Sequence, residues 1–289
     1  MSTQAILERE SRYRRWVVVA SILPLLLLVA AAAIQASGGS ESNLDPAALR
    51  IIDENGAPLL IGAIVAAIAF ILLAFPLAYL FKAAQARSDR VLGGLLFLVV
   101  LGPFLFGLQG VLLAISQIDV ADKFVAQENG VGDIYSLSNN LAEDSGLQSA
   151  ALIAQTIGVL ALIFAMIYVP LWSVRTGLLT RFHGTLGMAL GASFILPPLT
   201  AITLPALLAW FMYFGLVLAG RTPRGRPPAW DAGEAISPPA RGEEPEAVAA
   251  SAGGGEVVEG DATEIPGVDE NPNAARRERA KKRKRKRRR

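Results

Sequence analysis

The sequence predicts an all-α protein, a polytopic transmembrane bundle of six helical spans followed by a disordered C-terminal tail. The first observation is composition: of 289 residues, 53% are hydrophobic and 18% are charged, against about 25% charged residues in soluble domains. The second is a set of long runs without charge. The third is the distribution of charge, because 12 of the 27 Lys and Arg lie in residues 276–289. Polar residues are too few to cover a water-facing surface, so a membrane protein is expected.

Five runs are long and apolar enough to cross a hydrocarbon core of about 30 Å, which takes roughly 20 helical residues. None of them contains Asp, Glu, Lys, Arg or His. Backbone amides in lipid must be satisfied within the segment itself, so each run is expected to be a helix. The runs are 16–34, 59–80, 91–115, 151–172 and 199–218.

Basic residues alternate along the chain as the positive-inside rule expects. Residues 1–15 hold four arginines and residues 81–90 hold three basic residues, so both segments are predicted to be cytoplasmic. Residues 35–58 and 116–150 each hold one basic residue among several acids, so both are predicted to lie outside. Within the first of these outer segments a short helix is expected, with Asp45 as its N-cap.

A sixth and weaker run, 178–196, is interrupted near its start by Arg181 and His183. A basic loop precedes this run and another follows the last span, so the number of crossings between them must be even. The run is therefore predicted to cross, with an outer turn at residues 197–198. Both termini are then cytoplasmic. The alternative has five crossings, a re-entrant or interfacial helix at 184–196, and an external tail.

These segments define the predicted organisation of the chain. A cytoplasmic N-terminus covers 1–15 and a six-helix domain covers 16–220. A linker rich in Pro, Gly and Glu covers 221–275, and a polybasic tail covers 276–289. The first span also resembles a signal peptide, but its 19 residues exceed the usual apolar core of about 7–15, which favours an uncleaved anchor.

Small residues recur at helical spacing in two of the spans and predict tight helix packing, because they let backbones approach closely. The same stripes would also suit a homo-oligomer, and both interpretations stay open. The stripe in the fourth span is Ala151, Ala154, Gly158, Ala161 and Ala165, and that in the fifth is Gly184, Gly187 and Gly191.

Few residues could carry chemistry inside the membrane. Ion-coupled transport usually needs an ionisable residue within a span, and none of the five strong runs has one. Gln109, Gln155 and Thr156 are the candidates for a polar pathway, or for hydrogen bonds between helices. With no Cys, one His and no catalytic or nucleotide-binding motif, we expect no enzyme activity, no cofactor and no metal. His183 is expected to contact lipid headgroups.

The composition changes after residue 220. Residues 221–275 hold eleven acids against four arginines and few large apolar residues, which is typical of disorder. Trp230 is the exception, and it is expected either to anchor in the membrane interface or to fold back on the inner loops. Interfacial anchoring is the favoured interpretation of the two.

The terminal run is a candidate contact for polyanions. Each basic residue near an anionic leaflet contributes about 1 kcal/mol, and the same charges would hold the phosphates of nucleic acid or a ribosome. A purely solvated tail is the alternative. The residues are Lys281, Lys282, Arg283, Lys284, Arg285, Lys286, Arg287, Arg288 and Arg289.

Two stretches carry a resemblance. LLTRFHGTLGMALG, followed by a last hydrophobic span and GRTPRGRPPAWDAGEAI, resembles multi-pass membrane proteins of actinobacterial type, loosely related to a bacterial six-span family of unknown function. The resemblance covers about residues 10–236. It implies a six-span count and a plasma-membrane location, and it assigns no site.

Two functions follow as hypotheses. The first is a non-enzymatic integral membrane protein that anchors the polybasic tail for association with anionic lipid, nucleic acid or a protein partner. The second is a small-solute permease or channel that is not coupled to ions. A continuous polar cavity lined by Gln109, Gln155 or Thr156 favours the second, and a filled centre favours the first.

Overall fold

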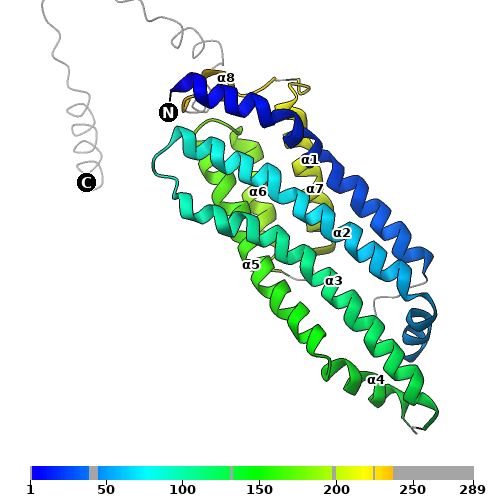
Figure 1. Cartoon of the computed structure of the whole chain (residues 1–289). Helices are drawn as coiled ribbons and strands as arrows, with labels where there is room; N and C mark the ends of the chain where they lie inside the picture. The colour runs from blue at the N-terminus through cyan, green and yellow to red at the C-terminus, as the bar shows by residue number, and fades with distance from the viewer. Residues whose placement is uncertain (1, 39–44, 131–132, 197–199, 224, 237–289) are drawn as a thin grey trace, which may run out of the picture. The chain divides into compact units, whose positions relative to one another are not determined.

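The computed structural model describes residues 2–38, 45–130, 133–196, 200–223 and 225–236. Within these ranges every regular element is a helix, which confirms the predicted all-α class (Figure 1). The polybasic tail lies outside the described residues. The elements are α1 Thr3–Ser37, α2 Pro46–Arg87, η1 Gly93–Leu95, α3 Leu96–Gln127, η2 Glu128–Gly130, α4 Ile134–Glu143, α5 Gly146–Arg175, α6 Arg181–Ser193, α7 Thr200–Leu218 and α8 Ala229–Ala232.

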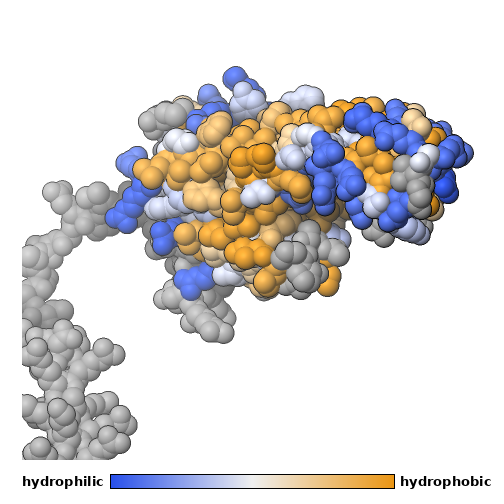
Figure 2. Space-filling model, turned by 90° about the horizontal axis from the view of Figure 1, so that it is seen from below, coloured by the Kyte–Doolittle hydropathy of each residue, from blue (hydrophilic) through white to orange (hydrophobic). Residues whose placement is uncertain are grey.

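Four of these helices are long and apolar enough to cross a membrane, namely α1, α2, α3 with its flanking turns, and α5. They contain the predicted spans 16–34, 59–80 and 151–172, and all of 91–115 except Val91 and Leu92. Large apolar side chains face outward from their middles, with Leu26 61% exposed and Leu160 63% exposed. Apolar residues cover much of the face seen in Figure 2. Exposed apolar surface on this scale is what lipid covers in a membrane protein.

The centre of the bundle is built where α3 packs against α5. A Cβ on Gly102 would lie 2.7 Å from the backbone nitrogen of Leu162, and one on Gly158 would lie 3.0 Å from the Cβ of Leu105. Only residues without a side chain allow two backbones to approach so closely. The five small residues predicted as a stripe on α5 are all buried.

Helices α6 and α7 form an antiparallel pair. The hydroxyls of Ser193 and Thr203 are 2.9 Å apart and join the end of α6 to the start of α7. With 13 residues, α6 is about 20 Å long and covers only part of the predicted span 178–196. Its Gly191 packs on Met166, which lies about 14 Å along α5 from Arg175. The predicted outer turn at residues 197–198 lies outside the described part of the chain.

A second, smaller apolar cluster lies at the outer end. The predicted helix there does begin at Asp45, whose carboxylate accepts a hydrogen bond of 2.7 Å from the amide of Ala48. It does not stop but continues into the second span through a kink at Asn55. Leu49 and Ile52 are buried against the end of α3, so this segment extends the bundle.

The opposite end is called the inner end below. There α1 begins, α2 and α5 end, and the chain after α7 folds back over the helix ends (Figure 1). It is the end that the basic residues predict to be cytoplasmic.

Candidate functional site

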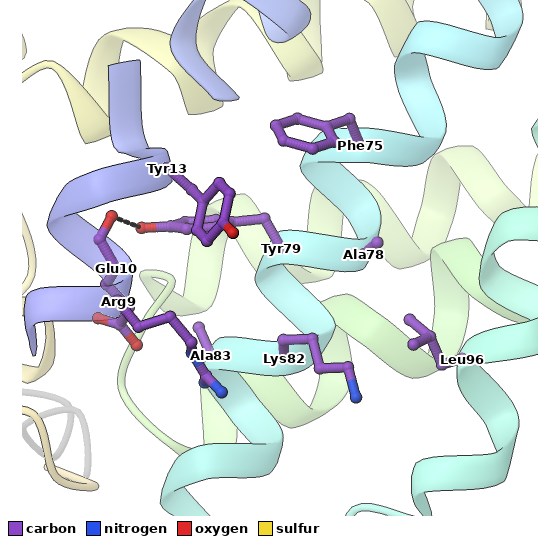
Figure 3. A pocket seen from close by; sticks show the side chains of 9 residues that line it. All are labelled: Arg9, Glu10, Tyr13, Phe75, Ala78, Tyr79, Lys82, Ala83 and Leu96. Atoms are coloured by element: carbon purple, nitrogen blue, oxygen red, sulfur yellow. Dashed lines mark hydrogen bonds between the residues drawn. The ribbon is translucent and has the colours of Figure 1, made fainter. Parts of the chain in front are cut away.

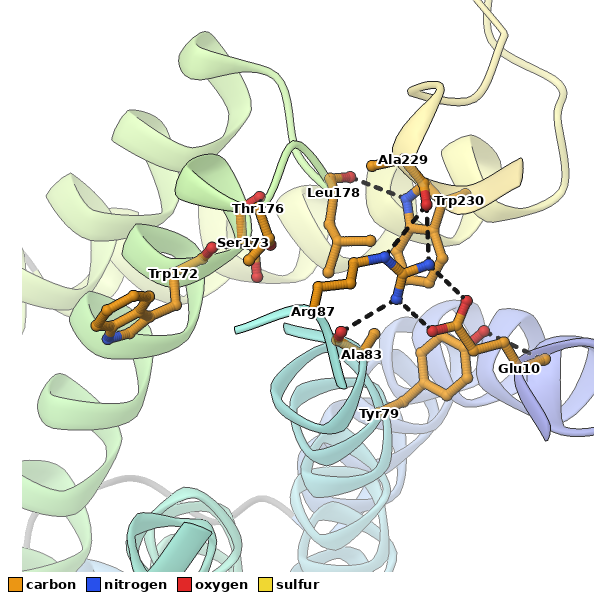
Figure 4. A network of polar contacts seen from close by, with 10 residues as sticks. All are labelled: Glu10, Tyr79, Ala83, Arg87, Trp172, Ser173, Thr176, Leu178, Ala229 and Trp230. Atoms are coloured by element: carbon orange, nitrogen blue, oxygen red, sulfur yellow. Dashed lines mark hydrogen bonds and ion pairs between the residues drawn. The ribbon is translucent and has the colours of Figure 1, made fainter. Parts of the chain in front are cut away.

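A buried polar cluster at the inner end joins the start of α1 and the segment around α8 to the end of α2 (Figure 4). We call it the inner clamp and define it as Glu10, Tyr79, Arg87 and Trp230. Arg87 donates from Nη1 to Glu10 Oε1 at 2.5 Å and from Nη2 to Glu10 Oε2 at 3.0 Å. The side chains are 0% and 7% exposed, respectively. A two-pronged pair of this kind is strong and fixes the orientation of both groups.

The guanidinium of Arg87 uses all of its donors. Nε and Nη2 both donate to the carbonyl of Ala229, at 3.2 and 2.9 Å, and Nη1 also donates to the carbonyl of Ala83 at 3.0 Å. Its carbon lies 5.5 Å from the centroid of the Trp230 ring, within cation–π range. Because every N–H has an acceptor, the burial of this charge is compensated by polar contacts.

Trp230 closes the inner clamp from the C-terminal side. Its Nε1 donates to the carbonyl of Leu178 at 2.9 Å, and its ring stacks on Tyr79 with centroids 5.7 Å apart. The Tyr79 hydroxyl donates in turn to the carbonyl of Glu10 at 3.2 Å. The interpretation of Trp230 as an interfacial anchor is therefore wrong, and folding back on the inner loops is confirmed.

The segment 225–236, which contains Trp230, has a further contact with the bundle at its C-terminal end. The amide of Ile236 donates to the carbonyl of Thr176 at 3.4 Å. Gly177 has a φ of +75°, and a Cβ there would lie 1.9 Å from the carbonyl oxygen of Ile236. Glycine at this position therefore permits both the loop conformation and the contact. The packed part of the chain thus extends to Ile236, well into the range 221–275 predicted as linker.

Beside the inner clamp lies a groove of about 330 Å³ between α1, α2 and α3. We call it the inner groove. Its walls are the rings of Tyr13, Phe75 and Tyr79 and the side chains of Ala78, Ala83 and Leu96, with Arg9, Glu10 and Lys82 completing the lining (Figure 3).

A second hollow, of about 360 Å³, lies nearer the outer end between α1, α2 and α3. Gln109 lines it together with Gln35 and Gln117. The lining residues nearest the inner end are Phe70 and Phe106, whose ring centroids are 4.7 Å apart. Aromatic packing therefore separates this outer cavity from the inner end.

The other two candidates for a polar pathway lie elsewhere. Gln155 and Thr156 are on the exposed side of α5, and the Thr156 hydroxyl donates to the carbonyl of Leu152 at 2.8 Å. Neither lines the outer cavity. The described residues therefore do not bring the three candidates together.

The stripe on α6 positions aromatic side chains. Gly184, Gly187 and Gly191 are buried, and a Cβ on Gly187 would lie 2.9 Å from the indole of Trp210. That indole donates to the carbonyl of His183 at 2.9 Å and stacks on the imidazole at 4.6 Å. His183 is 3% exposed, so the expected headgroup contact is wrong, because packing against α7 encloses the ring.

The pair of Glu10 and Arg87 is the feature that sequence reasoning missed. The positive-inside rule counts the basic residues of 81–90 only as a charge that orients the chain. Glu10, an acid among the four arginines of the N-terminal segment, was the available signal. The neighbouring sequence does not indicate which basic residue pairs with it. The polybasic residues Lys281 to Arg289 fall outside the described residues.

Comparisons with protein families, with curated proteins and with solved structures give no match. The functional interpretation therefore depends on the residues and on the geometry of this chain.

Proposed function

We propose that this protein is a non-enzymatic integral membrane protein whose helical bundle anchors a cytoplasmic polybasic tail, and that the tail associates with polyanions. Anionic lipid is the first candidate, and nucleic acid, a ribosome or an acidic protein partner are the others. In keeping with the resemblance noted above, we place it with bacterial six-span proteins, both termini in the cytoplasm. The fifth and sixth embedded helices are then α6 and α7.

The inner clamp is the observation that carries this proposal. It fixes the segment 225–236 to the helix ends because Arg87, held by Glu10, donates to the carbonyl of Ala229 and the indole of Trp230 donates to the carbonyl of Leu178. The backbone contact of Ile236 with Thr176 holds the end of the same segment. The linker therefore starts from a fixed point at Ile236. If residues 237–275 are the flexible linker that the composition predicts, their root-mean-square reach is about 34 Å. A reach of that size would let the basic run return to the membrane surface.

Energetics favour association over free solvation. The terminal run holds 12 Lys and Arg, and each contributes about 1 kcal/mol next to an anionic leaflet, in a salt-dependent manner. The acids of the linker reduce this sum by competing for the same charges. A surplus remains after that competition, because the run is far denser in charge than the linker.

The packing of the centre favours an anchor over a permease. The outer cavity ends at Phe70 and Phe106, and a large apolar cluster fills the region between those rings and the inner clamp. A neutral solute would have to displace both rings to pass.

The test uses the full-length protein in nanodiscs of neutral phosphatidylcholine. All 12 basic residues of 276–289 are replaced with Gln, and the binding of phosphatidylglycerol vesicles and of an RNA oligonucleotide is measured over a range of salt concentrations. We expect the wild type to bind at least one of the two probes, with an affinity that falls steeply as salt rises. The affinity of the variant for that probe should be at least tenfold lower. A matched control deletes the uncharged residues 247–255 and keeps the basic run, and it should bind within about threefold of wild type. Equal binding by wild type and Gln variant would refute the proposal.

A further inference from the structure

The inner groove has two chemically different ends. Figure 3 shows the guanidinium of Arg9 and the ammonium of Lys82 at one end and the ring of Phe75 at the other. Phe75 and Lys82 are seven positions apart on α2, which is about 10 Å along the helix axis. A ligand that fills the groove must therefore combine an anionic group with an apolar body of roughly that length.

The cationic end is available to a ligand. Within the described ranges, no carboxylate forms an ion pair with Arg9 or Lys82. Glu10 also lines the groove, but both of its oxygens are held by Arg87 on the far side. Lys82 is hydrogen-bonded to the neutral amide of Gln85 at 3.2 Å. The groove therefore carries positive charge that the folded bundle does not neutralise.

The apolar end is open to the surroundings of the bundle. Phe75 is 41% exposed and Tyr13 is 45% exposed, although both belong to helices that are suited to cross a membrane. Tyr13 lies one turn from Trp16, which is also exposed, and aromatic residues of this kind gather at the headgroup level of a bilayer. The groove thus lies where the hydrocarbon of a leaflet meets its headgroups.

We propose that the inner groove is a binding site for one anionic phospholipid of the inner leaflet. The lipid phosphate contacts Arg9 and Lys82, and an acyl chain lies between Tyr13, Phe75 and Leu96. Basic pockets between membrane helices are suited to anionic headgroups. A small soluble anion would leave the aromatic walls uncovered, a choline headgroup would face like charge, and the chain's own basic tail would be repelled. This site is on the bundle and is independent of the function proposed for the tail.

The experiment titrates phosphatidylglycerol into the full-length protein in detergent and counts retained lipids by native mass spectrometry. The variant R9Q/K82Q removes the cationic end. The matched control R12Q/R90Q removes two basic residues that are exposed at the same end of the bundle and do not line the groove. We expect the affinity for the first lipid to fall at least tenfold in R9Q/K82Q and to stay within twofold in the control.

A second variant tests the apolar part with the charge unchanged. Ala78→Trp fills the groove from α2 and is expected to lower retention of the first lipid by at least fivefold. Glycerol 1-phosphate, which has the anionic group without acyl chains, should not displace the lipid. Equal losses in R9Q/K82Q and R12Q/R90Q, or displacement by glycerol 1-phosphate, would overturn the proposal. Because the basic tail is intact in every variant, its own lipid binding is a constant background, and failure here leaves the tail proposal standing.

Discussion

Arg87 illustrates how one side chain can fix two distant parts of a chain. Removing an arginine and a glutamate from water carries a desolvation penalty of several kcal/mol per ion, which is offset only if geometry and hydrogen bonding are good. Here the carboxylate of Glu10 accepts two hydrogen bonds, and the other N–H groups of the guanidinium donate to backbone carbonyls. The pair is stable because it is complete, and it is vulnerable to loss of either partner.

The substitution Arg87→Met tests this directly. It leaves the Glu10 carboxylate buried without a partner and the carbonyl of Ala229 without its donor, and should lower the free energy of unfolding by about 3–5 kcal/mol. Thermal unfolding of the detergent-solubilised protein measures the change, with Arg90→Met, at an exposed site, as the control. The double variant E10Q/R87M should lose less than the sum of the two single variants, because both remove one interaction. Equal unfolding temperatures for R87M and R90M would contradict the buried pair.

The helices associate through the absence of side chains. Gly102 of α3 lies against the backbone of α5. On the same helix, a Cβ on Gly107 would lie 2.9 Å from the carbonyl oxygen of Ala67 on α2. One helix therefore has close contacts on two sides. The regular stripe on α5 was visible in the sequence, whereas the glycines of α3 have no regular spacing.

A pair of glycine substitutions separates close packing from helix propensity. Replacing Gly by Ala inside a helix favours the helix by about 1 kcal/mol when space is free. Nothing lies within 4 Å of a Cβ at Gly110, so Gly110→Ala should be neutral or stabilising. Gly102→Ala should destabilise the protein by about 1–3 kcal/mol, because two backbones must move apart. Thermal unfolding under identical conditions checks both, and a stabilising G102A would show that α3 and α5 are not in contact.

The molecule as a whole keeps its two described ends together. The first helix begins, and the segment 225–236 is fixed, at the same inner end. The pair α6 and α7 starts and finishes there as well, whether or not its tip reaches the opposite leaflet. This geometry favours the proposed even number of crossings over the five-crossing alternative.

Topology can be tested with single cysteines, since the chain has none of its own. A membrane-impermeant maleimide applied to intact cells should label Ser40→Cys in the first outer segment. Ser88→Cys and Ser237→Cys should react only after permeabilisation, because the positive-inside rule predicts that both segments are cytoplasmic. Labelling of Ser237→Cys on intact cells would support five crossings and remove the basis for a cytoplasmic role of the tail.

Much of the fold was predictable because it depends on local sequence. Runs of about 20 apolar residues predicted the four long helices, Asp45 predicted the start of α2, and the spacing of small residues predicted which face of α5 is buried. The length of α6 was not predictable in the same way. Apolar residues continue to Leu196, but the helix ends at Ser193, and hydropathy does not report where a helix turns back.

The sequence by itself determined that this chain is helical, apolar on its outside and asymmetric in charge, since these properties depend on length and composition alone. Only the tertiary structure decided that Arg87 pairs with Glu10 across 77 positions of sequence, that Trp230 is buried, and that Arg9 and Lys82 share a groove. The physical reason is that counting charges along the sequence treats every Lys and Arg alike, whether it is buried in an ion pair or exposed. Burial and pairing depend instead on which distant segments the packed helices bring into contact.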